Sequence, residues 1–136
     1  MRALCRASRR GAEVSLYIPR SSDKYLVDLA AESYFAELLR ARVKIYRGGG
    51  PFNHTKAGTI DGVWATLGSL NLDFVSLRYN FEGNIVTNDS GFISKIDTHF
   101  ADDCKSAELL TASAWHRRPL YRKVLHICIL PLRFLL

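Results

Sequence analysis

The sequence is poor in the features that cross-link a chain covalently or through a metal. Only three of its 136 residues are cysteines, and Cys5, Cys104 and Cys128 are far apart with no C-x-x-C spacing. This pattern predicts neither a disulfide framework nor a zinc site. We therefore expect three isolated, buried thiols in a protein of a reducing compartment.

Long apolar runs are missing as well. The longest is Val124 to Leu136, which is too short to cross a bilayer and is interrupted by His126, Pro131 and Arg133. The basic stretch at residues 1–11 is not followed by an unbroken apolar segment, so it does not predict a signal peptide. The apolar end is therefore a candidate for lying on a membrane rather than crossing it.

The composition is that of one globular domain with an excess of positive charge. Hydrophobic residues make up 48% and charged residues 24% of the chain, which is close to the globular average. Nineteen Lys and Arg against thirteen Asp and Glu give a net charge of +6. A basic surface attracts partners that carry phosphate, and both nucleic acid and anionic lipid headgroups fit this description.

The first third of the chain predicts alternating helices and strands. The expected elements are a helix ending before Gly11, a strand over 13–18, a helix over 26–40 and a short strand over 43–46. This order favours an α/β fold with a largely parallel sheet. Because the chain opens with a helix that has no strand before it, we expect a truncated half-domain.

The middle of the chain predicts a β-hairpin. Two extended runs, 52–60 and 63–67, are joined by Asp61-Gly62, a strong hairpin signal. Side chains alternate between the faces of a strand, so His54 and Lys56 share one face and Asp61 does not lie on it. The remaining expected elements are a strand over 80–86, a helix starting at Asp89 or Ser90 and a last helix over 120–129.

Six residues in this region follow a known pattern. His54, Lys56, Asp61, Gly68, Ser69 and Asn71 match H-x-K-x(4)-D-x(6)-G-S-x-N, the signature of the phospholipase D superfamily. Over residues 1 to about 110 the chain most resembles the C-terminal half of bacterial cardiolipin synthases. The resemblance implies a phospholipase D-like fold, with a mixed, largely parallel sheet flanked by helices.

The resemblance also implies a role for each matched residue. His54 would be the nucleophile that forms a phosphohistidine, for which an imidazole suits because it is neutral near pH 7 and can leave again. Lys56 would place a positive charge beside the phosphate oxygens, and Ser69 and Asn71 would donate hydrogen bonds to them. The resemblance implies no metal ion and no other cofactor.

One residue outside the motif completes the expected site. Glu82 matches the acidic residue that, in this family, accepts a hydrogen bond from the second ring nitrogen of the nucleophilic histidine. Asp61 and Gly68 are expected to be structural. The predicted catalytic residues are thus His54, Lys56 and Glu82, and the predicted phosphate-binding residues are Lys56, Ser69 and Asn71.

The family site needs two H-x-K motifs, whereas this chain has one. The other histidines, His99, His116 and His126, are followed two positions later by Ala101, Arg118 and Cys128. The second motif is expected from a dimer partner or from an N-terminal region of a longer protein. The leading interpretation is a cardiolipin synthase-type phosphatidyltransferase acting on a phosphatidylglycerol-like phospholipid. The alternatives are a homodimeric phosphodiesterase or nuclease and an inactive fragment.

The end of the chain differs in character from the rest. We expect a phospholipase D-like catalytic half-domain over 1–112 and a basic, apolar tail over 113–136. The tail fits an anchor on an anionic membrane surface and fits equally a terminal helix that packs into a core. The expected location is peripheral, on the cytoplasmic side of the cell membrane. Nucleic acid is expected as a partner only under the nuclease alternative.

Overall fold

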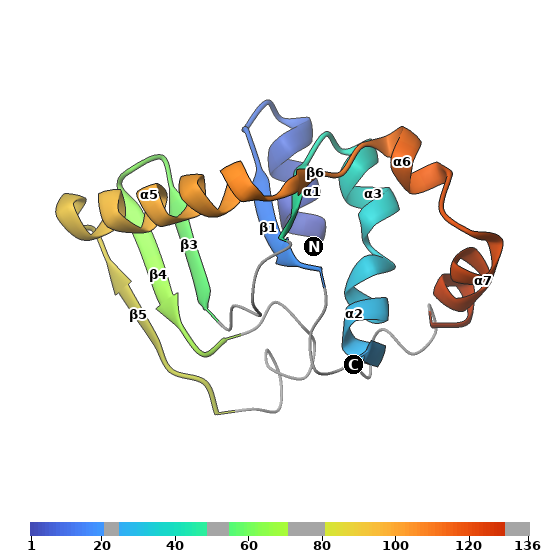
Figure 1. Ribbon diagram of the computed structural model, residues 1–136. Helices are drawn as coiled ribbons and strands as arrows, with labels where there is room; N and C mark the ends of the chain where they lie inside the picture. Colours follow the sequence, from blue (N-terminus) through green and yellow to red (C-terminus); the bar gives the residue numbers. More distant parts are fainter. Residues whose placement is uncertain (21–24, 49–54, 71–80, 130–136) are drawn as a thin grey trace.

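The protein has a mixed α/β fold. The computed structural model describes residues 1–20, 25–48, 55–70 and 81–129 (Figure 1). The elements in chain order are α1 (Arg2–Arg9), β1 (Ser15–Pro19), α2 (Tyr25–Glu32), α3 (Phe35–Arg40), β2 (Lys44–Gly48), β3 (Lys56–Ile60), β4 (Trp64–Gly68), β5 (Asn84–Thr87), α5 (Ser90–Ser106), β6 (Glu108–Leu109), α6 (Ala112–His116) and α7 (Leu120–Ile129). The expected α/β class, with sheets flanked by helices, is confirmed.

The described strands form two three-stranded sheets, in the orders β1-β2-β6 and β3-β4-β5. β1 and β2 pair in parallel, as the helix and strand order predicted. The other three pairings, β2 with β6, β3 with β4 and β4 with β5, are antiparallel. The expectation of a largely parallel sheet does not hold for the described strands: α2 and α3 cross over between β1 and β2 and make them parallel, whereas the tight hairpin makes β3 and β4 antiparallel.

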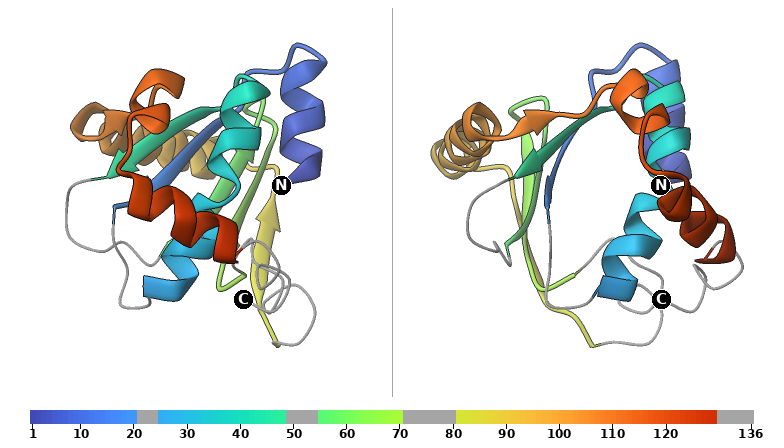
Figure 2. Two further views of the ribbon diagram at one scale, coloured as in Figure 1. Left: turned by 90° about the vertical axis from the view of Figure 1, so that its right-hand side faces the viewer. Right: turned by 45° about the vertical axis from the view of Figure 1, so that its right-hand side comes forward.

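The sheet β1-β2-β6 lies between two helical layers. Ile45 of β2 packs into the main core, whose other buried members are Cys5, Phe35, Leu38, Ala41, Val43 and Trp115. The next residue, Tyr46, faces the opposite side and meets Phe100 of α5 edge-on, with ring centroids 6.5 Å apart. Figures 1 and 2 show α1, α3 and α6 on one side of this sheet and α5 on the other. Because successive side chains of a strand point to opposite faces, β2 contacts both helical layers.

The single helix expected over 26–40 is two helices. α2 ends at Glu32 and α3 begins at Phe35. Between them, the Ser33 hydroxyl donates to the Ala30 carbonyl at 2.6 Å, and this kind of side-chain bond competes with the helical ladder and bends it. The apolar pattern continues across the break, so it gave no warning of the bend.

Other boundaries agree with or depart from the expectations. Asp89 caps α5 by accepting from the Phe92 N–H at 2.7 Å, and α7 covers the predicted residues. β5 begins only at Asn84, so the strand expected over 80–86 is shorter, and the sequence did not predict β6 or α6.

All three cysteines are free, but Cys104 is half-buried and Cys128 is exposed. The expectation of three buried thiols is wrong for these two.

A buried polar cluster holds α7 against α2, and we call it the Glu32 cluster (Glu32, Arg47, Arg118, Arg122 and His126). The Glu32 side chain accepts from Arg47 Nη2 at 3.0 Å and from His126 Nε2 at 3.1 Å, while Arg122 Nη1 lies 3.7 Å away. Arg118 Nε donates to His126 Nδ1 at 3.3 Å, which leaves the imidazole proton on Nε2, facing Glu32. The Glu32 carboxylate therefore interacts with Arg47 of β2 and with Arg122 and His126 of α7.

The Glu32 cluster makes the stability of the fold depend on pH. Burial lowers the pKa of His126 below 6.5, although the hydrogen bond to Glu32 opposes this effect. The unfolded chain, with an ordinary imidazole, then binds a proton at higher pH than the folded chain does. We expect the free energy of unfolding to be greatest above pH 6.5 and to fall below it, down to the lower pKa of the folded state.

Urea denaturation on both sides of pH 6.5 measures this dependence. His126→Gln should flatten the change over this pH range. His116→Gln, at an exposed histidine of α6, should leave it intact. Equal flattening by both substitutions would show that His126 is not its source.

Candidate functional site

The matched motif surrounds one end of the sheet β3-β4-β5. Lys56, the first residue of β3, pairs with Gly68, the last residue of β4, and Gly68 pairs with Asn84, the first residue of β5. Directly paired residues share a face, so these three residues lie in a row across one face of the sheet. Ser69 follows Gly68 directly, and Glu82 precedes Asn84 by two residues. The ammonium, hydroxyl and carboxylate groups predicted for the site therefore belong to the same end of the sheet.

The opposite face of this sheet is covered by α5. Thr59 Oγ1 of β3 donates to Asp97 Oδ1 of α5 at 2.6 Å, and the neighbouring Ala65 of β4 is fully buried. Thr59 and Ala65 are paired and lie one residue out of phase with the Lys56 face. The helix thus occupies one side of the sheet and leaves the motif on the other.

Asp61 lies away from this end, in the hairpin turn. The backbone φ is 50° at Asp61 and 68° at Gly62, and the Val63 N–H bonds to the Ile60 carbonyl at 3.0 Å. Two successive residues with positive φ are the geometry that favours Asp-Gly in hairpins. The predicted hairpin is confirmed, and Asp61 is exposed at its tip, at the far end of the sheet from Lys56.

Ser69 is fixed by hydrogen bonds to the segment before β5. Its N–H bonds to the Gly83 carbonyl at 3.1 Å, and its hydroxyl accepts from the Gly83 N–H at 3.1 Å. The Gly83 carbonyl lies 3.5 Å from the hydroxyl, at the limit of a hydrogen bond. The serine proton is therefore only weakly engaged within the described residues, and it can be donated to a phosphate oxygen.

Asn84 has a role that the sequence reasoning missed. Its Oδ1 accepts from the Leu70 N–H at 3.2 Å, and its Nδ2 donates to Thr66 Oγ1 at 3.0 Å. The side chain thus fixes the segment that carries Gly68 and Ser69. Its position two residues after Glu82 indicates a shared face by strand parity but gives no partner.

Gly68 is required by close packing at this point. A Cβ atom there would lie 2.3 Å from both the Gly83 carbonyl oxygen and Asn84 Oδ1. Because one of these atoms belongs to the backbone, Gly68→Ala must push β4 and β5 apart. We expect a loss of about 1–3 kcal/mol in the free energy of unfolding, measured by urea denaturation.

Gly58→Ala is the matched control in the neighbouring strand, because its nearest neighbour would be Thr66 Cγ2 at 3.8 Å, an ordinary contact. The control should keep most of the stability. If both variants unfolded at the same urea concentration, the close approach at Gly68 would not be what constrains this position.

The remaining site residues are only partly placed. Lys56 and Glu82 are half-buried. His54 and Asn71 lie outside the described residues, so the nucleophile and one phosphate-binding residue stay predictions. Among the described residues, no group of three or more His, Cys, Asp or Glu side chains could hold a metal ion, and no helix is long and apolar enough to span a membrane.

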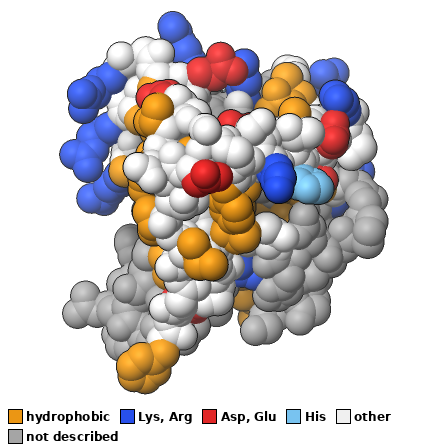
Figure 3. Space-filling model, turned by 90° about the vertical axis from the view of Figure 1, so that its left-hand side faces the viewer, with side chains coloured by type: hydrophobic (Ala, Val, Ile, Leu, Met, Phe, Trp, Pro, Cys, Tyr) orange, Lys and Arg blue, Asp and Glu red, His pale blue; other side chains and the backbone are white. Residues whose placement is uncertain are grey.

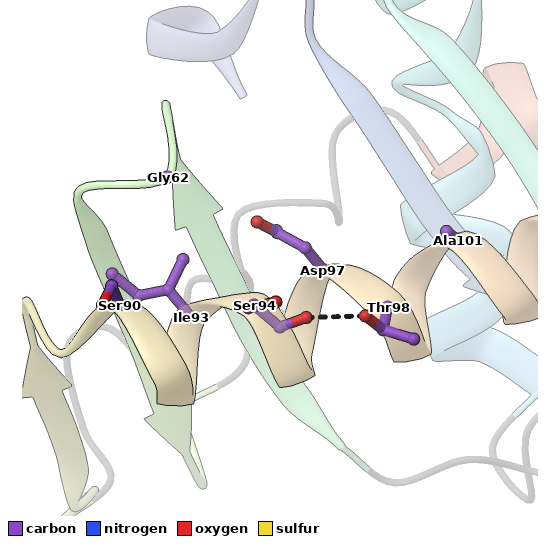
Figure 4. A pocket seen from close by; sticks show the side chains of 7 residues that line it. All are labelled: Gly62, Ser90, Ile93, Ser94, Asp97, Thr98 and Ala101. Carbon is purple, nitrogen blue, oxygen red and sulfur yellow. Dashed lines mark hydrogen bonds between the residues drawn. The ribbon is translucent and has the colours of Figure 1, made fainter.

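A cavity of about 350 Å³ lies on the α5 side of the hairpin, away from the motif face. It extends from Gly62 along α5, where Figure 4 shows the Thr98 hydroxyl bonded to the Ser94 carbonyl at 2.8 Å. Among the described residues that line it, Asp97 is the only charged one, and it already accepts from Thr59. The cavity lies across the sheet from the Lys56 face, so it is not the site that the motif predicts.

Comparisons with known proteins agree with the family resemblance of the sequence. Residues 1–104 match the family described as "Cardiolipin synthase, PLD-like domain". Over 124 residues the chain is 40% identical to cardiolipin synthase A of Klebsiella pneumoniae and of Salmonella arizonae, covering 91% of this chain and 26% of each synthase. The chain thus spans about a quarter of the length of these relatives.

A solved structure shows a similar fold. The phospholipase D family member Nuc from Salmonella typhimurium superimposes with a TM-score of 0.70 at 19% identity, covering 82% of this chain and 72% of Nuc. At this identity the similarity shows the fold alone.

Proposed function

Because this chain belongs to the cardiolipin synthase family of phospholipase D-like domains, we propose that it carries half of the active site of a phosphatidyltransferase. The observation that carries the proposal is the register of β3, β4 and β5, which brings Lys56, Ser69 and Glu82 to one end of one sheet. His54 precedes Lys56 by two residues and belongs, by strand parity, to the same face.

The proposed reaction exchanges one phosphodiester for another. A ring nitrogen of His54 attacks the phosphorus of a phosphatidylglycerol-like donor, and the bond from phosphorus to the leaving glycerol oxygen breaks. That oxygen takes a proton from the histidine of a second H-x-K motif. An acceptor alcohol then attacks the phosphohistidine, the P–N bond breaks, and the alcohol proton passes to the second histidine. The bonds broken and formed are equivalent, so no cofactor is needed.

The other residues stabilise the transferring group. Lys56 places a fixed positive charge near the phosphate oxygens, where negative charge gathers in the transition state. Ser69 donates its weakly engaged proton, and Asn71 adds a second hydrogen bond. Glu82 accepts from the other ring nitrogen of His54 and fixes its tautomer. Glu82 and Lys56 are therefore proposed to act with His54, as catalytic residues.

The second H-x-K motif is proposed to come from another polypeptide region. Either a second copy of this chain or an N-terminal region of a longer protein would supply it. A homodimeric phosphodiesterase or nuclease is the second candidate function. One observation favours it: the chain contains a single H-x-K motif.

We place the protein peripherally at the cytoplasmic side of a cell membrane. The proposed phospholipid substrate and the positive charge of the chain support this location. The division into a catalytic half-domain over 1–112 and a tail over 113–136 stays a prediction. Within the described part of this tail, α6 packs against α3 and α7 packs against α2.

The test combines an activity assay with a measurement of hydrodynamic mass. The chain is incubated with vesicles of phosphatidylglycerol, and if a second copy of the chain supplies the second H-x-K motif we expect cardiolipin and free glycerol as products. Cleavage of a soluble phosphodiester by a stable dimer, without cardiolipin formation, would favour the nuclease candidate. A monomer without turnover on either substrate would contradict activity of this chain and favour an inactive fragment.

A further inference from the structure

Helix α7 is inverted relative to an ordinary surface helix. An amphipathic helix normally buries its apolar stripe and exposes its polar side. In α7 the inward side carries Arg122 and His126, which reach Glu32, together with Ile129, which packs on Leu29 and Ala30 of α2. The outward side is apolar and exposed, and it consists of Leu120, Tyr121, Val124, Leu125, Ile127 and Cys128.

The outward residues form one continuous surface. At 3.6 residues per turn they fall within a single arc of the helix, and Arg122 and Lys123 lie at its two margins. Figure 2 shows α7 lying beside α2 at the periphery of the molecule, and the apolar residues of this arc are exposed. Exposed apolar residues also occur at Tyr25 and Leu26, the start of α2. Contiguous apolar surface of this kind marks an interaction site.

The charged side chains that the segment around α7 itself carries are of one sign. Residues 109–136 contain Arg117, Arg118, Arg122, Lys123 and Arg133 and no Asp or Glu. A symmetric contact between two copies of α7 would bring these like charges together, which is unfavourable. An anionic lipid surface suits both the exposed apolar face and the positive charge of this segment. It accepts apolar side chains below its headgroups and pairs with basic side chains at the level of the headgroups. Tyr121, with an apolar ring and a polar hydroxyl, suits the boundary between the two.

We propose that the outward face of α7 is a docking surface for anionic phospholipid bilayers, on which the helix lies parallel to the membrane plane. The choice of a lipid occupant rests on the proposed function. The Glu32 cluster makes this orientation possible, because it satisfies the polar side of α7 within the protein and turns the apolar side outward. The surface is separate from the motif on the sheet β3-β4-β5.

The experiment measures co-sedimentation of the full 136-residue chain with vesicles. One set contains phosphatidylcholine and phosphatidylserine, and the other contains phosphatidylcholine alone. Phosphatidylserine supplies negative charge without being the proposed donor, so binding is not confused with occupation of the active site. We expect at least about tenfold tighter binding to the anionic vesicles, weakening as salt is added.

A matched pair of variants locates the surface. One carries Leu120→Gln, Val124→Gln and Ile127→Gln, at side chains that are 77%, 58% and 66% exposed. The control carries Ile60→Gln, Val63→Gln and Ile85→Gln, at side chains that are 55%, 65% and 64% exposed. The control positions lie on the opposite side of the molecule, where Figure 3 shows further exposed hydrophobic side chains. Both variants keep the charge of the chain, and circular dichroism checks that each is folded.

We expect the α7 variant to lose at least about tenfold in vesicle affinity and the control to keep it. Equal binding by the two variants, or no preference of the parent chain for anionic vesicles, would overturn the proposal. So would a parent dimer that becomes monomeric in the α7 variant while vesicle binding is unchanged, because the face would then join two copies.

A second measurement leaves the apolar side chains of the outward face other than Cys128 unchanged. Cys128 lies on this face, and an environment-sensitive fluorophore on it reports its surroundings, in a chain with Cys104→Ser and with the buried Cys5 replaced by the small apolar alanine, Cys5→Ala. We expect a blue shift on adding anionic vesicles, and an unshifted emission would contradict docking through this face. The His54→Asn chain should bind vesicles like the parent, so a failure of the catalytic proposal and a failure of docking are distinguishable.

Discussion

His54→Asn is expected to abolish phosphatidyl transfer and the phosphohistidine that precedes it. Asparagine keeps a polar side chain of similar reach but has no nitrogen that can attack phosphorus and later leave. Removing the nucleophile of a covalent mechanism lowers kcat by at least about 10³-fold. The measurement is cardiolipin formation from phosphatidylglycerol vesicles, together with acid-labile, base-stable labelling of the protein by a radioactive phosphate donor.

The matched control is His99→Asn, the same substitution at an exposed histidine of α5. It should keep full activity and full labelling. Lys56→Met should retain the labelling site but lower its rate of formation, because the charge near the phosphate oxygens is lost. If His54→Asn kept the activity of the parent chain, the proposed mechanism would be wrong whatever the quaternary structure.

Glu32→Gln is expected to cause the largest loss of stability. The carboxylate is 6% exposed, and Arg47 on its other side is also largely buried. The amide removes the negative charge and leaves Arg47, whose other described hydrogen bond is to the Arg20 carbonyl at 2.8 Å. Breaking a buried ion pair from one side typically costs about 3–5 kcal/mol, which urea denaturation measures directly.

The exposed pair of Glu13 and Lys44 provides the comparison. These side chains lie 2.6 Å apart but are accessible to solvent, so Glu13→Gln should change the unfolding midpoint little. Glu32→Gln combined with Arg47→Met should recover part of the loss, because no unpaired charge then remains at β2. A loss at Glu32 as small as that at Glu13 would show that the cluster contributes little to stability.

At the candidate site, the sequence predicted the features that neighbouring residues specify and missed those that depend on distant residues. Asp61-Gly62 has a backbone preference that acts within four residues, so the hairpin followed from it, whereas its register, which pairs Lys56 with Gly68, was decided by the structure. The contacts of Ser69 and Asn84 cross from β4 to the segment before β5, and nothing in either stretch alone specifies the partner. The bend at Ser33 was missed for the opposite reason, because one side-chain hydrogen bond interrupted a helix whose apolar pattern continues.

The contacts of the Glu32 cluster, like those of Ser69 and Asn84, join residues that are distant in the sequence. Glu32 and His126 are 94 residues apart and meet at 3.1 Å, which no periodicity or motif indicated. The expectation that the thiols are buried failed at Cys128, since residue type favours burial but the orientation of α7 decides it. That orientation is set by the buried carboxylate on α2.

The sequence by itself determined the family, the hairpin and the residue types of the site, because spacing along the chain and strand parity are local and the motif is specific. It also determined the extent of α7. The tertiary structure alone decided the antiparallel pairings of β2 with β6 and of β4 with β5, the positioning of Ser69 by Gly83 and the outward turn of the apolar face of α7. These features depend on which distant groups share a surface, and burial of Glu32 selects the polar side of α7 as its partner because an unpaired buried charge is costly.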